Sequence, residues 1–516
     1  MNTYDVAVVG YGPSGVTAAN FLGQYGIRTV ILERDHDVFP RARAVTVDDF
    51  TLRLFQTVGL DAELRANMDP KAVLRWKTYA GRELLRTCDT GDGRYGQPAS
   101  SMIFQPALEK TLRAGADRFG DVVDIRFGQE FRSLEQDADG VTLTAADVET
   151  GATSTVRAKY VIACDGGASG VRERLGIPLE GSTDPQQWVI IDAKVKRWWP
   201  ERDLLTFWSD PARPAVDIPL ALDHHRWELP IRADEPREKF ADPAHLWELL
   251  RPYGVTPDHV EILHHAFYLH HTRRAARWRE GRVLLAGDAA HMMPPWAGQG
   301  MQSGIRDAHN LAWKLAHVVR GTLPESVLDT YEVERGPHVA EMTKLALGMG
   351  VMIESRKPAV IALRNTLLPL VKYVPGLNKF VGEFKFKPLP SVKRGFLTGA
   401  GRRGLVGKMI PQPRVALATG SRVPLDDALG DGFAVLGLDA DPRAVMSAAD
   451  QTAWAALGAR FLTLRSLGAP PRDDADVIDH LGVLAPWMRA ARTRVVVLRP
   501  DRFVVAADPT GLSVPA

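Results

Sequence analysis

Three glycines near the N-terminus have the spacing of a dinucleotide-binding turn. Gly10, Gly12 and Gly15 follow one another as G-x-G-x-x-G, with Pro13 and Ser14 between the second and the third. In such a turn the first glycine permits a tight bend, the second lets a diphosphate approach the backbone, and the third lets a helix pack closely on a strand. The N–H groups and the dipole at the start of that helix favour an anion. These residues therefore predict a site for the diphosphate of a dinucleotide.

The elements that position these glycines are predicted on both sides of them. Residues 4–9 form an apolar, β-branched run typical of a buried strand, and residues 14–25 have the composition of a helix that ends before Gly26. Residues 30–32 predict a second strand, and it ends at Glu33, a carboxylate placed to accept hydrogen bonds from ribose hydroxyls. The glycine spacing alone would also fit an ordinary loop, whereas strand, helix and acid together favour dinucleotide binding. Because an acid here disfavours a 2′-phosphate, we expect FAD or NAD rather than NADP as the tight ligand.

A second stretch with chemical potential begins at a predicted buried strand over residues 283–286. Gly287 and Asp288 end this strand, a loop rich in Gly and Pro follows, and residues 303–320 predict a helix. A glycine loop that leads into a helix N-terminus again favours an anion or an electron-rich ligand. His291 invites a catalytic interpretation, but a single His beside a strand end is more often structural.

A third acid occupies a similar position. Residues 160–163 predict a buried strand, and Asp165 and Gly166 follow its end closely. A strand-terminal Asp-Gly is often only a turn. Nevertheless Glu33, Asp165 and Asp288 together fit the rule that α/β proteins bind ligands at the carboxyl ends of their strands.

Composition and charge restrict the class of protein. At 516 residues the chain is too long for one core, and two or three domains are expected. A hydrophobic content of 45% is that of a soluble globular protein, and a formal net charge of +2 gives no indication of nucleic acid or of a membrane as partner. Cys88 and Cys164 are the only cysteines, so there is no disulfide framework and no C-x-x-C metal or redox pair. We expect a cytoplasmic protein without a metal, a signal peptide or a membrane span.

The rest of the chain predicts further units. Residues 186–271 are rich in Trp and His in alternating patterns that favour antiparallel strands with an aromatic core. Residues 356–412 form a connection rich in Pro, Lys and Arg, and a separate unit begins at about residue 413.

Three motifs taken together resemble one protein family. They are GYGPSG, then CDGG followed by Ser169 and Arg172, and finally GDAAHMMPP with GQGMQSGIRDAHNLAWKLA. This combination resembles the flavin-dependent aromatic hydroxylases of the para-hydroxybenzoate hydroxylase class (class A). Within that class the chain is most similar to the phenol-hydroxylating branch that includes 3-(3-hydroxyphenyl)propionate hydroxylase.

The resemblance implies an α/β fold with a Rossmann-type FAD-binding domain, an inserted, mainly antiparallel β substrate domain, and a C-terminal thioredoxin-like domain that lacks redox cysteines. The implied FAD-binding domain covers residues 1–72, 102–184 and 272–355, and the substrate domain residues 73–101 and 185–271. Residues 356–412 would be a helical linker region, and residues 413–516 the C-terminal domain, with a role in packing or in a homodimer.

The resemblance also implies roles for matching residues. Non-covalent FAD would be held by Gly10, Gly12, Pro13, Ser14, Gly15, Glu33, Arg34, Arg43, Gln105, Asp165, Gly166, Gly287, Asp288, Pro295, Gly298, Gly300, Met301 and Gln302. Arg43, Pro295 and Trp296 are the candidates for a direct part in catalysis. Gln302 departs from the family, which usually has Asn in this loop, so the side-chain contact made by that Asn is not carried over.

The implied reaction is the ortho-hydroxylation of a small phenol. NAD(P)H would reduce FAD transiently, O2 would add to form a hydroperoxyflavin, and its terminal oxygen would attack the ring. A base that activates the phenol should come from residues 186–271, and Arg213 or Arg226 could bind a substrate carboxylate. The sequence leaves open the identity of the phenol and the choice between NADH and NADPH.

Alternative functions remain. A flavin halogenase typically has a Trp-x-Trp-x-Ile-Pro run, which this sequence lacks, and a disulfide reductase needs a close cysteine pair. A flavin-dependent oxidase and a non-catalytic flavin-binding module are also consistent with the nucleotide motifs.

Overall fold

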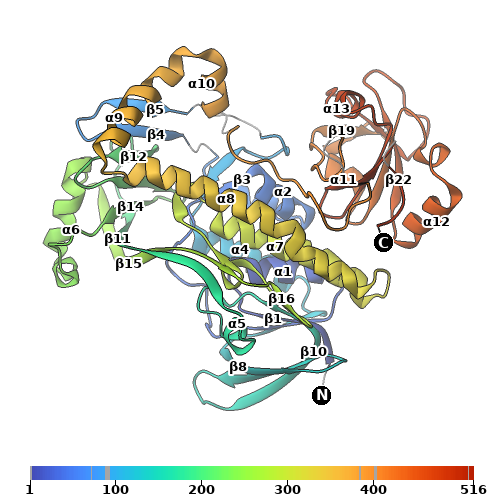
Figure 1. Cartoon of the computed structure of the whole chain (residues 1–516), viewed down its shortest axis with the longest axis horizontal. Helices are drawn as coiled ribbons and strands as arrows, with labels where there is room; N and C mark the ends of the chain where they lie inside the picture. Colours follow the sequence, from blue (N-terminus) through green and yellow to red (C-terminus); the bar gives the residue numbers. More distant parts are fainter. Residues whose placement is uncertain are drawn as a thin grey trace.

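The computed structural model describes residues 3–70, 73–87, 93–382, 385–399, 404–508 and 511–515, so Cys88 lies outside the described residues. The described chain is a mixed α/β structure with two eight-stranded sheets and one seven-stranded sheet (Figure 1). None of its described helices is both long and apolar enough to cross a membrane.

The first sheet is built around β1, the apolar run predicted as a strand. β1 pairs in parallel with β2 and β10, β2 with β7, and β10 with β17. The carboxyl ends of these strands therefore meet at one edge, where Glu33, Asp165 and Asp288 follow β2, β10 and β17. The strands of this sheet are β1 (Thr3–Val9), β2 (Thr29–Leu32), β7 (Val123–Arg126), β8 (Gln129–Gln136), β9 (Val141–Asp147), β10 (Thr153–Ala163), β16 (Arg279–Glu280) and β17 (Val283–Leu285).

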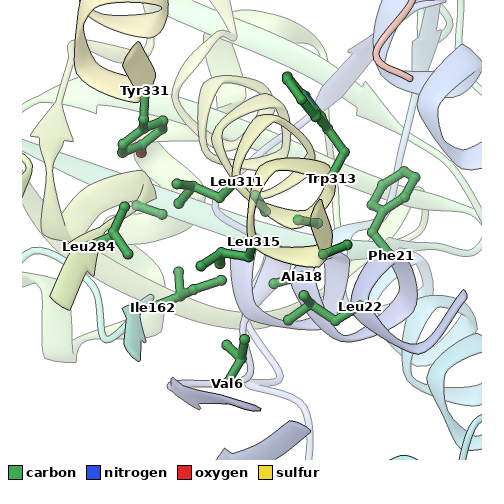
Figure 2. Packing of buried hydrophobic residues seen from close by; sticks show 14 of the residues in the cluster. Val6, Ala18, Phe21, Leu22, Ile162, Leu284, Leu311, Trp313, Leu315 and Tyr331 are labelled. Atoms are coloured by element: carbon green, nitrogen blue, oxygen red, sulfur yellow. The ribbon is translucent and has the colours of Figure 1, made fainter. Parts of the chain in front are cut away.

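Helices pack on this sheet through a continuous apolar core. α1 (Pro13–Gln24) packs against both α4 (Gln105–Asp117) and α7 (Gly300–Val319). Figure 2 shows side chains of the sheet, of α1, of α7 and of α8 in this core: Val6, Ile162, Leu284, Ala18, Phe21, Leu22, Leu311, Trp313, Leu315 and Tyr331. Burying one large apolar side chain contributes about 1.5–3 kcal/mol, so this core holds the strand ends firmly in place.

α7 begins three residues earlier than predicted. The helix starts at Gly300, so Met301 and Gln302 lie in its first turn rather than in the preceding loop. The glycine content suggested a longer loop, but tertiary contacts override that local preference: the buried Gln302 side chain bonds to residues before and within α2 (Asp49–Thr57).

The second sheet has two different faces because side chains alternate along each strand. On β14, Trp227 and Leu229 pack in a core with α6 (Pro243–Leu250), while Glu228 points to the opposite face. That opposite face carries Phe207 and Ile218 toward the first sheet's edge. Its strands, in spatial order, are β18 (His291–Met292), β15 (Val260–Ala275), β11 (Leu179–Val195), β14 (His224–Pro230), β13 (Ala215–Leu220), β12 (Leu205–Ser209), β4 (Leu74–Thr78) and β5 (Glu83–Arg86). As predicted, the strands within residues 186–271 pair antiparallel.

The long helix α8 (Thr330–Glu354) crosses the molecule and leads to α9 (Pro358–Leu367) and α10 (Pro375–Gly382), which lie beside β4 and β5 (Figure 1). A two-stranded sheet, β3 (Thr46–Asp48) with β6 (Ser100–Met102), lies next to α2. The other helices and 3-10 turns before residue 385 are α3 (Asp61–Ala66), α5 (Gly170–Arg174), η1 (Arg237–Ala241), η2 (Arg251–Tyr253), η3 (Gly287–Ala289), η4 (Pro295–Ala297), η5 (Glu325–Asp329) and η6 (Leu368–Tyr373).

The C-terminal part forms its own sheet and core (Figure 1). Its strands, in spatial order, are β20 (Arg422–Pro424), β19 (Arg414–Leu417), β23 (Asp476–Ile478), β22 (Arg460–Arg465), β21 (Ala434–Leu438), β24 (Val495–Leu498) and β25 (Val504–Ala507). Its helices are α11 (Leu425–Leu429), η7 (Pro442–Ala444), α12 (Ala448–Ala456) and α13 (Leu484–Ala490).

Buried ion pairs join this part to the rest. Arg499 contacts Glu334 of α8 at 2.8 Å and Asp501 at 2.5 Å, and Lys314 of α7 contacts Glu334 at 2.9 Å. All four side chains are almost completely buried, so the two parts of the chain are held by charges that solvent does not screen.

Candidate active site

A cavity of about 390 Å³ lies where the edge of the first sheet meets the inner face of the second. Most of the predicted cofactor residues line it: Gly12, Pro13, Ser14, Arg43, Gln105, Gly166, Asp288, Pro295, Gly298, Gly300, Met301 and Gln302. The second sheet and α8 contribute an apolar wall that includes Phe207, Ile218 and Met349. One cavity therefore adjoins both the nucleotide-binding elements and an apolar surface.

The glycine turn combines close packing with an open side. A Cβ on Gly15 would lie 2.0 Å from the carbonyl oxygen of Gly10, and a Cβ on Gly10, whose φ is +93°, would lie 2.6 Å from that of Cys164. A Cβ on Gly12 would meet no atom within 4 Å. Gly12 caps α1 without a side-chain hydrogen bond, and the first N–H groups of a helix have no partner within it. The turn thus has space and donors for a diphosphate.

Six predicted cofactor residues do not line the cavity: Gly10, Gly15, Glu33, Arg34, Asp165 and Gly287. Glu33 accepts hydrogen bonds from the N–H groups of Tyr11 at 2.5 Å and Asp35 at 2.8 Å. Arg34 is exposed and lies 3.9 Å from Asp35. Gly287 packs against Ser14.

Arg43 is positioned through its backbone. The side-chain oxygen of Gln105 accepts hydrogen bonds from the N–H groups of Arg43, at 2.7 Å, and of Ala44, at 2.6 Å. On the other side Arg226 donates to the carbonyl oxygens of Ala42 and Arg43. The segment that carries Arg43 is therefore clamped between α4 and the second sheet.

Two carboxyls at the strand ends have raised pKa values. Asp165 accepts a hydrogen bond from the N–H of Val171 at 3.0 Å, while its Oδ1 is buried without a partner among the described residues. The Asp288 side chain is exposed to the cavity that it lines, but many protein atoms lie around its carboxyl group. Burial raises the pKa of both groups, and for Asp288 the Arg43 charge opposes that rise.

The first turn of α7 is anchored by Gln302. Its side-chain oxygen accepts hydrogen bonds from Asp48 N at 3.0 Å and Thr51 Oγ1 at 2.9 Å, and its nitrogen donates to Gly298 O at 2.6 Å. The Gln302 side chain thus connects the loop of residues 295–299 to β3 and α2.

Trp296 and Pro295 form one side of the cavity. The Trp296 ring is 6% exposed and packs edge-on against Trp188, with ring centroids 5.1 Å apart, and against His270 at 4.9 Å. These contacts fix the indole as a wall between the loop and the second sheet.

His291 has the surroundings expected of a structural histidine. It is buried with Nε2 2.6 Å from Asp307 Oδ2, does not line the cavity, and belongs to a cluster with Arg335, which lies 2.8 Å from Asp307.

The expectation that Arg213 or Arg226 binds a substrate carboxylate is wrong. Arg226 is fully buried and contacts both oxygens of Asp192, at 2.7 and 2.8 Å. Arg213 is paired with Glu235, and neither guanidinium lines the cavity. Both charges are already neutralised by carboxylates that stabilise the sheet itself.

Sequence reasoning missed three charged residues of the lining: Asp48, Glu228 and Lys387. Glu228 follows Arg226 by two positions on β14, and strand alternation could have placed it on the inner face. Lys387 comes from the connection after α10 and pairs with Asp48 at the end of β3. No local signal in the sequence connects these two segments.

The donor set fits FAD. The helix N-termini of α1 and α7 both face the cavity, the space in front of Gly12 is open, and the Asp288 carboxyl lines the cavity. A diphosphate, a hydroxylated chain and an electron-rich ring system would each find suitable donors and acceptors here.

Comparison with known proteins agrees with this fit. The FAD binding domain family matches residues 3–346, and the HcaD C-terminal domain family matches residues 407–513. The chain is 41% identical over 514 residues to the 3-(3-hydroxy-phenyl)propionate/3-hydroxycinnamic acid hydroxylase of Mycolicibacterium smegmatis, covering 98% of this chain and 90% of the relative. It is 40% identical to the protein of the same name from Burkholderia cenocepacia, covering 99% and 95%.

Solved structures show the same fold over the full length. The flavin-dependent monooxygenase PieE, in complex with FAD and substrate, matches with a TM-score of 0.81 at 24% identity, covering 99% of this chain and 96% of that one. The anhydrotetracycline hydroxylase OxyS from Streptomyces rimosus matches with a TM-score of 0.76 at 26% identity, covering all of both chains. Together with the family match and the geometry of the cavity, these likenesses show that the chain belongs to the class A FAD-dependent aromatic hydroxylases.

Proposed function

We propose that this enzyme uses NAD(P)H and O2 to hydroxylate a small phenol at the carbon ortho to its hydroxyl group. The observation that carries the proposal is the shared cavity, in which residues suited to FAD adjoin an apolar wall that can hold an aromatic ring. The relatives named for 3-(3-hydroxyphenyl)propionate support a phenol as the substrate class.

Within this proposal the protein's part is to bind, orient and exclude water. Bound FAD would supply the redox chemistry between the reductant, O2 and the ring. The donors at the starts of α1 and α7, together with Asp288, would hold the cofactor. Phe207, Ile218 and Trp296 would hold the ring and keep water away from it.

We also propose the cofactor-binding roles and the division into domains that the resemblance implies. The order of the strands along the chain supports residues 185–271 as an inserted substrate domain. β11 to β15 belong to the second sheet, and in the sequence they come between β10 and β17, which belong to the first sheet. We assign a thioredoxin-like fold to residues 413–516, a cytoplasmic location to the enzyme, and packing or dimer contacts to its C-terminal part. Light scattering of the pure protein would test the dimer.

The decisive experiment follows isotopically labelled O2. The FAD-loaded enzyme should consume NAD(P)H several-fold faster with the right phenol, and one labelled oxygen atom should enter a catechol-type product. A panel that includes hydroxyphenylpropionates and alkylphenols would identify the substrate. If the label appears only in hydrogen peroxide with every aromatic compound, the enzyme is an oxidase and the proposal is wrong.

A further inference from the structure

The second sheet brings one ionisable side chain to the cavity. Its contributions to the lining are Leu74, Leu205, Phe207, Val216, Ile218 and Glu228. All except Glu228 are apolar. A ring that lies against this wall would meet a single group, among the described residues of the sheet that line the cavity, able to exchange a proton with it.

Neighbouring strands hold the Glu228 carboxyl in place. The hydroxyl of Tyr268 on β15 donates to Glu228 Oε2 at 2.9 Å. The residues directly opposite Glu228 are Ile190 on β11 and Val216 on β13, which carry no charge. The carboxyl is therefore positioned by one hydrogen bond and by apolar packing.

The positive charge beside Glu228 is shared with a second carboxylate. Arg226 on the same strand has Nη1 3.7 Å from Glu228 Oε1, but its guanidinium binds both oxygens of Asp192 on β11. His264 on β15 contacts the same aspartate at 3.0 Å. The next group beyond Tyr268 is His270, whose ring lies 5.0 Å from the Tyr268 ring.

His270 in turn lies 3.7 Å from Glu354 of α8. Burial lowers the pKa of His270 to about 4 and raises that of Glu354 to about 7. His270 is therefore uncharged at neutral pH and supplies no positive charge to Glu228.

These surroundings make Glu228 a better base than an ordinary carboxylate. Burial raises the pKa of Glu228, and the opposing effects of Arg226 and Tyr268 do not cancel the rise. Burial also raises the pKa of Tyr268 well above its ordinary value, so its hydroxyl remains the donor. A carboxyl with a raised pKa comes closer to a phenol, whose pKa is about 10, and proton transfer between them is correspondingly easier.

We propose that Glu228 is the catalytic base that takes the hydroxyl proton of the phenolic substrate. The assignment rests on the function proposed above. The O–H bond of the phenol breaks, its electron pair stays on the phenolic oxygen, and a new O–H bond forms on the Glu228 carboxylate. No electron is transferred in this step, and the resulting phenolate makes the ring carbon ortho to it more nucleophilic.

The test compares Glu228→Gln with wild type on phenols of different acidity. A positioned base contributes about 10²- to 10⁴-fold, so the variant should lose at least about 100-fold in turnover of a weakly acidic alkylphenol. With a nitrophenol that is already ionised at the assay pH, the loss should be less than about tenfold, because no base is needed. Glu261→Gln, the same change at an exposed position on β15, is the matched control.

The pH dependence separates a base from a structural residue. In the wild type kcat/KM should rise with pH as the Glu228 carboxyl ionises, and Glu228→Gln should lack this limb. Tyr268→Phe removes a hydrogen bond that favours the carboxylate, so it should keep the limb but move it to higher pH. If Glu228→Gln does not load FAD, the Tyr268→Phe profile still decides.

Four results would count against the assignment. If the wild type hydroxylates phenols while Glu228→Gln loses the same factor on every phenol, or keeps the pH limb, Glu228 is not the base. An unshifted limb in Tyr268→Phe would have the same meaning. If the wild type itself transfers labelled oxygen to no phenol, the proposed function fails first and the base assignment fails with it.

Discussion

Two glycines of the turn show how single residues shape the cofactor site: Gly12 faces open space, whereas Gly15 touches the backbone of Gly10. The backbone of Gly12 has φ −72°, which any residue can adopt. A side chain at Gly12 would therefore fill ligand space, and a side chain at Gly15 would disturb the fold.

This contrast predicts opposite effects of two substitutions. Gly12→Val should leave the unfolding temperature of the apoprotein unchanged and weaken FAD binding at least about tenfold. Gly15→Ala should lower the stability of the apoprotein by about 1–3 kcal/mol, because its Cβ would overlap the Gly10 oxygen. Thermal unfolding without FAD and fluorescence titration with FAD measure the two effects. A stability loss in Gly12→Val equal to that in Gly15→Ala would contradict the assignment.

A second prediction at this scale concerns Asp288. If its carboxylate binds a cofactor hydroxyl, a charged hydrogen bond of about 1.5–3 kcal/mol is lost in Asp288→Ala. FAD should then bind about 10- to 150-fold more weakly. Asp234→Ala, at an exposed loop position, is the control and should bind FAD as the wild type does. Equal FAD affinity in both variants would show that Asp288 does not touch the cofactor.

The residues that were predictable are those with local signals. The glycines and the acids at strand ends could be recognised because turn chemistry and strand boundaries fix them locally. Glu228 depends on which face of β14 is turned inward, and Lys387 on a contact with Asp48 across 339 positions of the chain. Arg226 was misjudged because its partner, Asp192, lies on a neighbouring strand whose register the sequence does not reveal.

At the scale of elements, the site depends on how the first turn of α7 is attached to β3 and α2. Gln302 makes this attachment with buried hydrogen bonds, and α7 begins at Gly300 rather than at the predicted residue 303. In the first sheet, β1, β2, β17 and the end of β10 were predictable because each is a short apolar run, whereas β7, β8, β9 and β16 are not such runs and were not predicted. The start of α7 was not predictable, because distant polar contacts determine it.

A double-mutant cycle tests this attachment. Gln302→Ala should destabilise the apoprotein by about 1–3 kcal/mol, since it leaves the Asp48 N–H buried without its partner. Thr51→Val removes a second hydrogen bond to the same oxygen, so the two effects should be less than additive, with a coupling energy of about 0.5–3 kcal/mol. Urea unfolding of the two single variants and the double variant gives the coupling. Strict additivity would mean that the two side chains do not interact.

At the scale of the whole molecule, the C-terminal part is bound to the FAD-binding part by buried charges. Asp501 contacts Arg499 and also accepts hydrogen bonds from Asn310 and Trp313 of α7. Arg499 lowers the pKa of Asp501 from its ordinary value of 3.8 to about 2. The interface therefore requires Asp501 in its ionised form.

This requirement predicts an acid-sensitive interface. A carboxyl with a lowered pKa in the folded state stabilises the fold above pH 3.8 and loses that effect as the pH falls toward 2. Asp501→Asn should lower the free energy of unfolding by about 3–5 kcal/mol at pH 7, because it breaks a buried ion pair. The difference in unfolding free energy between the variant and the wild type should be smaller at pH 3. Urea unfolding at both pH values measures this. Asp474→Asn, an exposed change in the same part, is the control, and a difference independent of pH would contradict the role of Asp501.

The cavity lining extends along the chain from Gly12 to Lys387, a separation of 375 positions. At a synthesis rate of about 5–20 residues per second, about 20 to 75 s pass between the first and the last of these residues. Early in synthesis the nascent chain contains the glycine turn, but it does not yet contain Asp288, which follows β17, or the segment that carries Lys387. The cofactor pocket is thus completed late in translation, and the apolar wall of the second sheet stays open to chaperones and to aggregation until then.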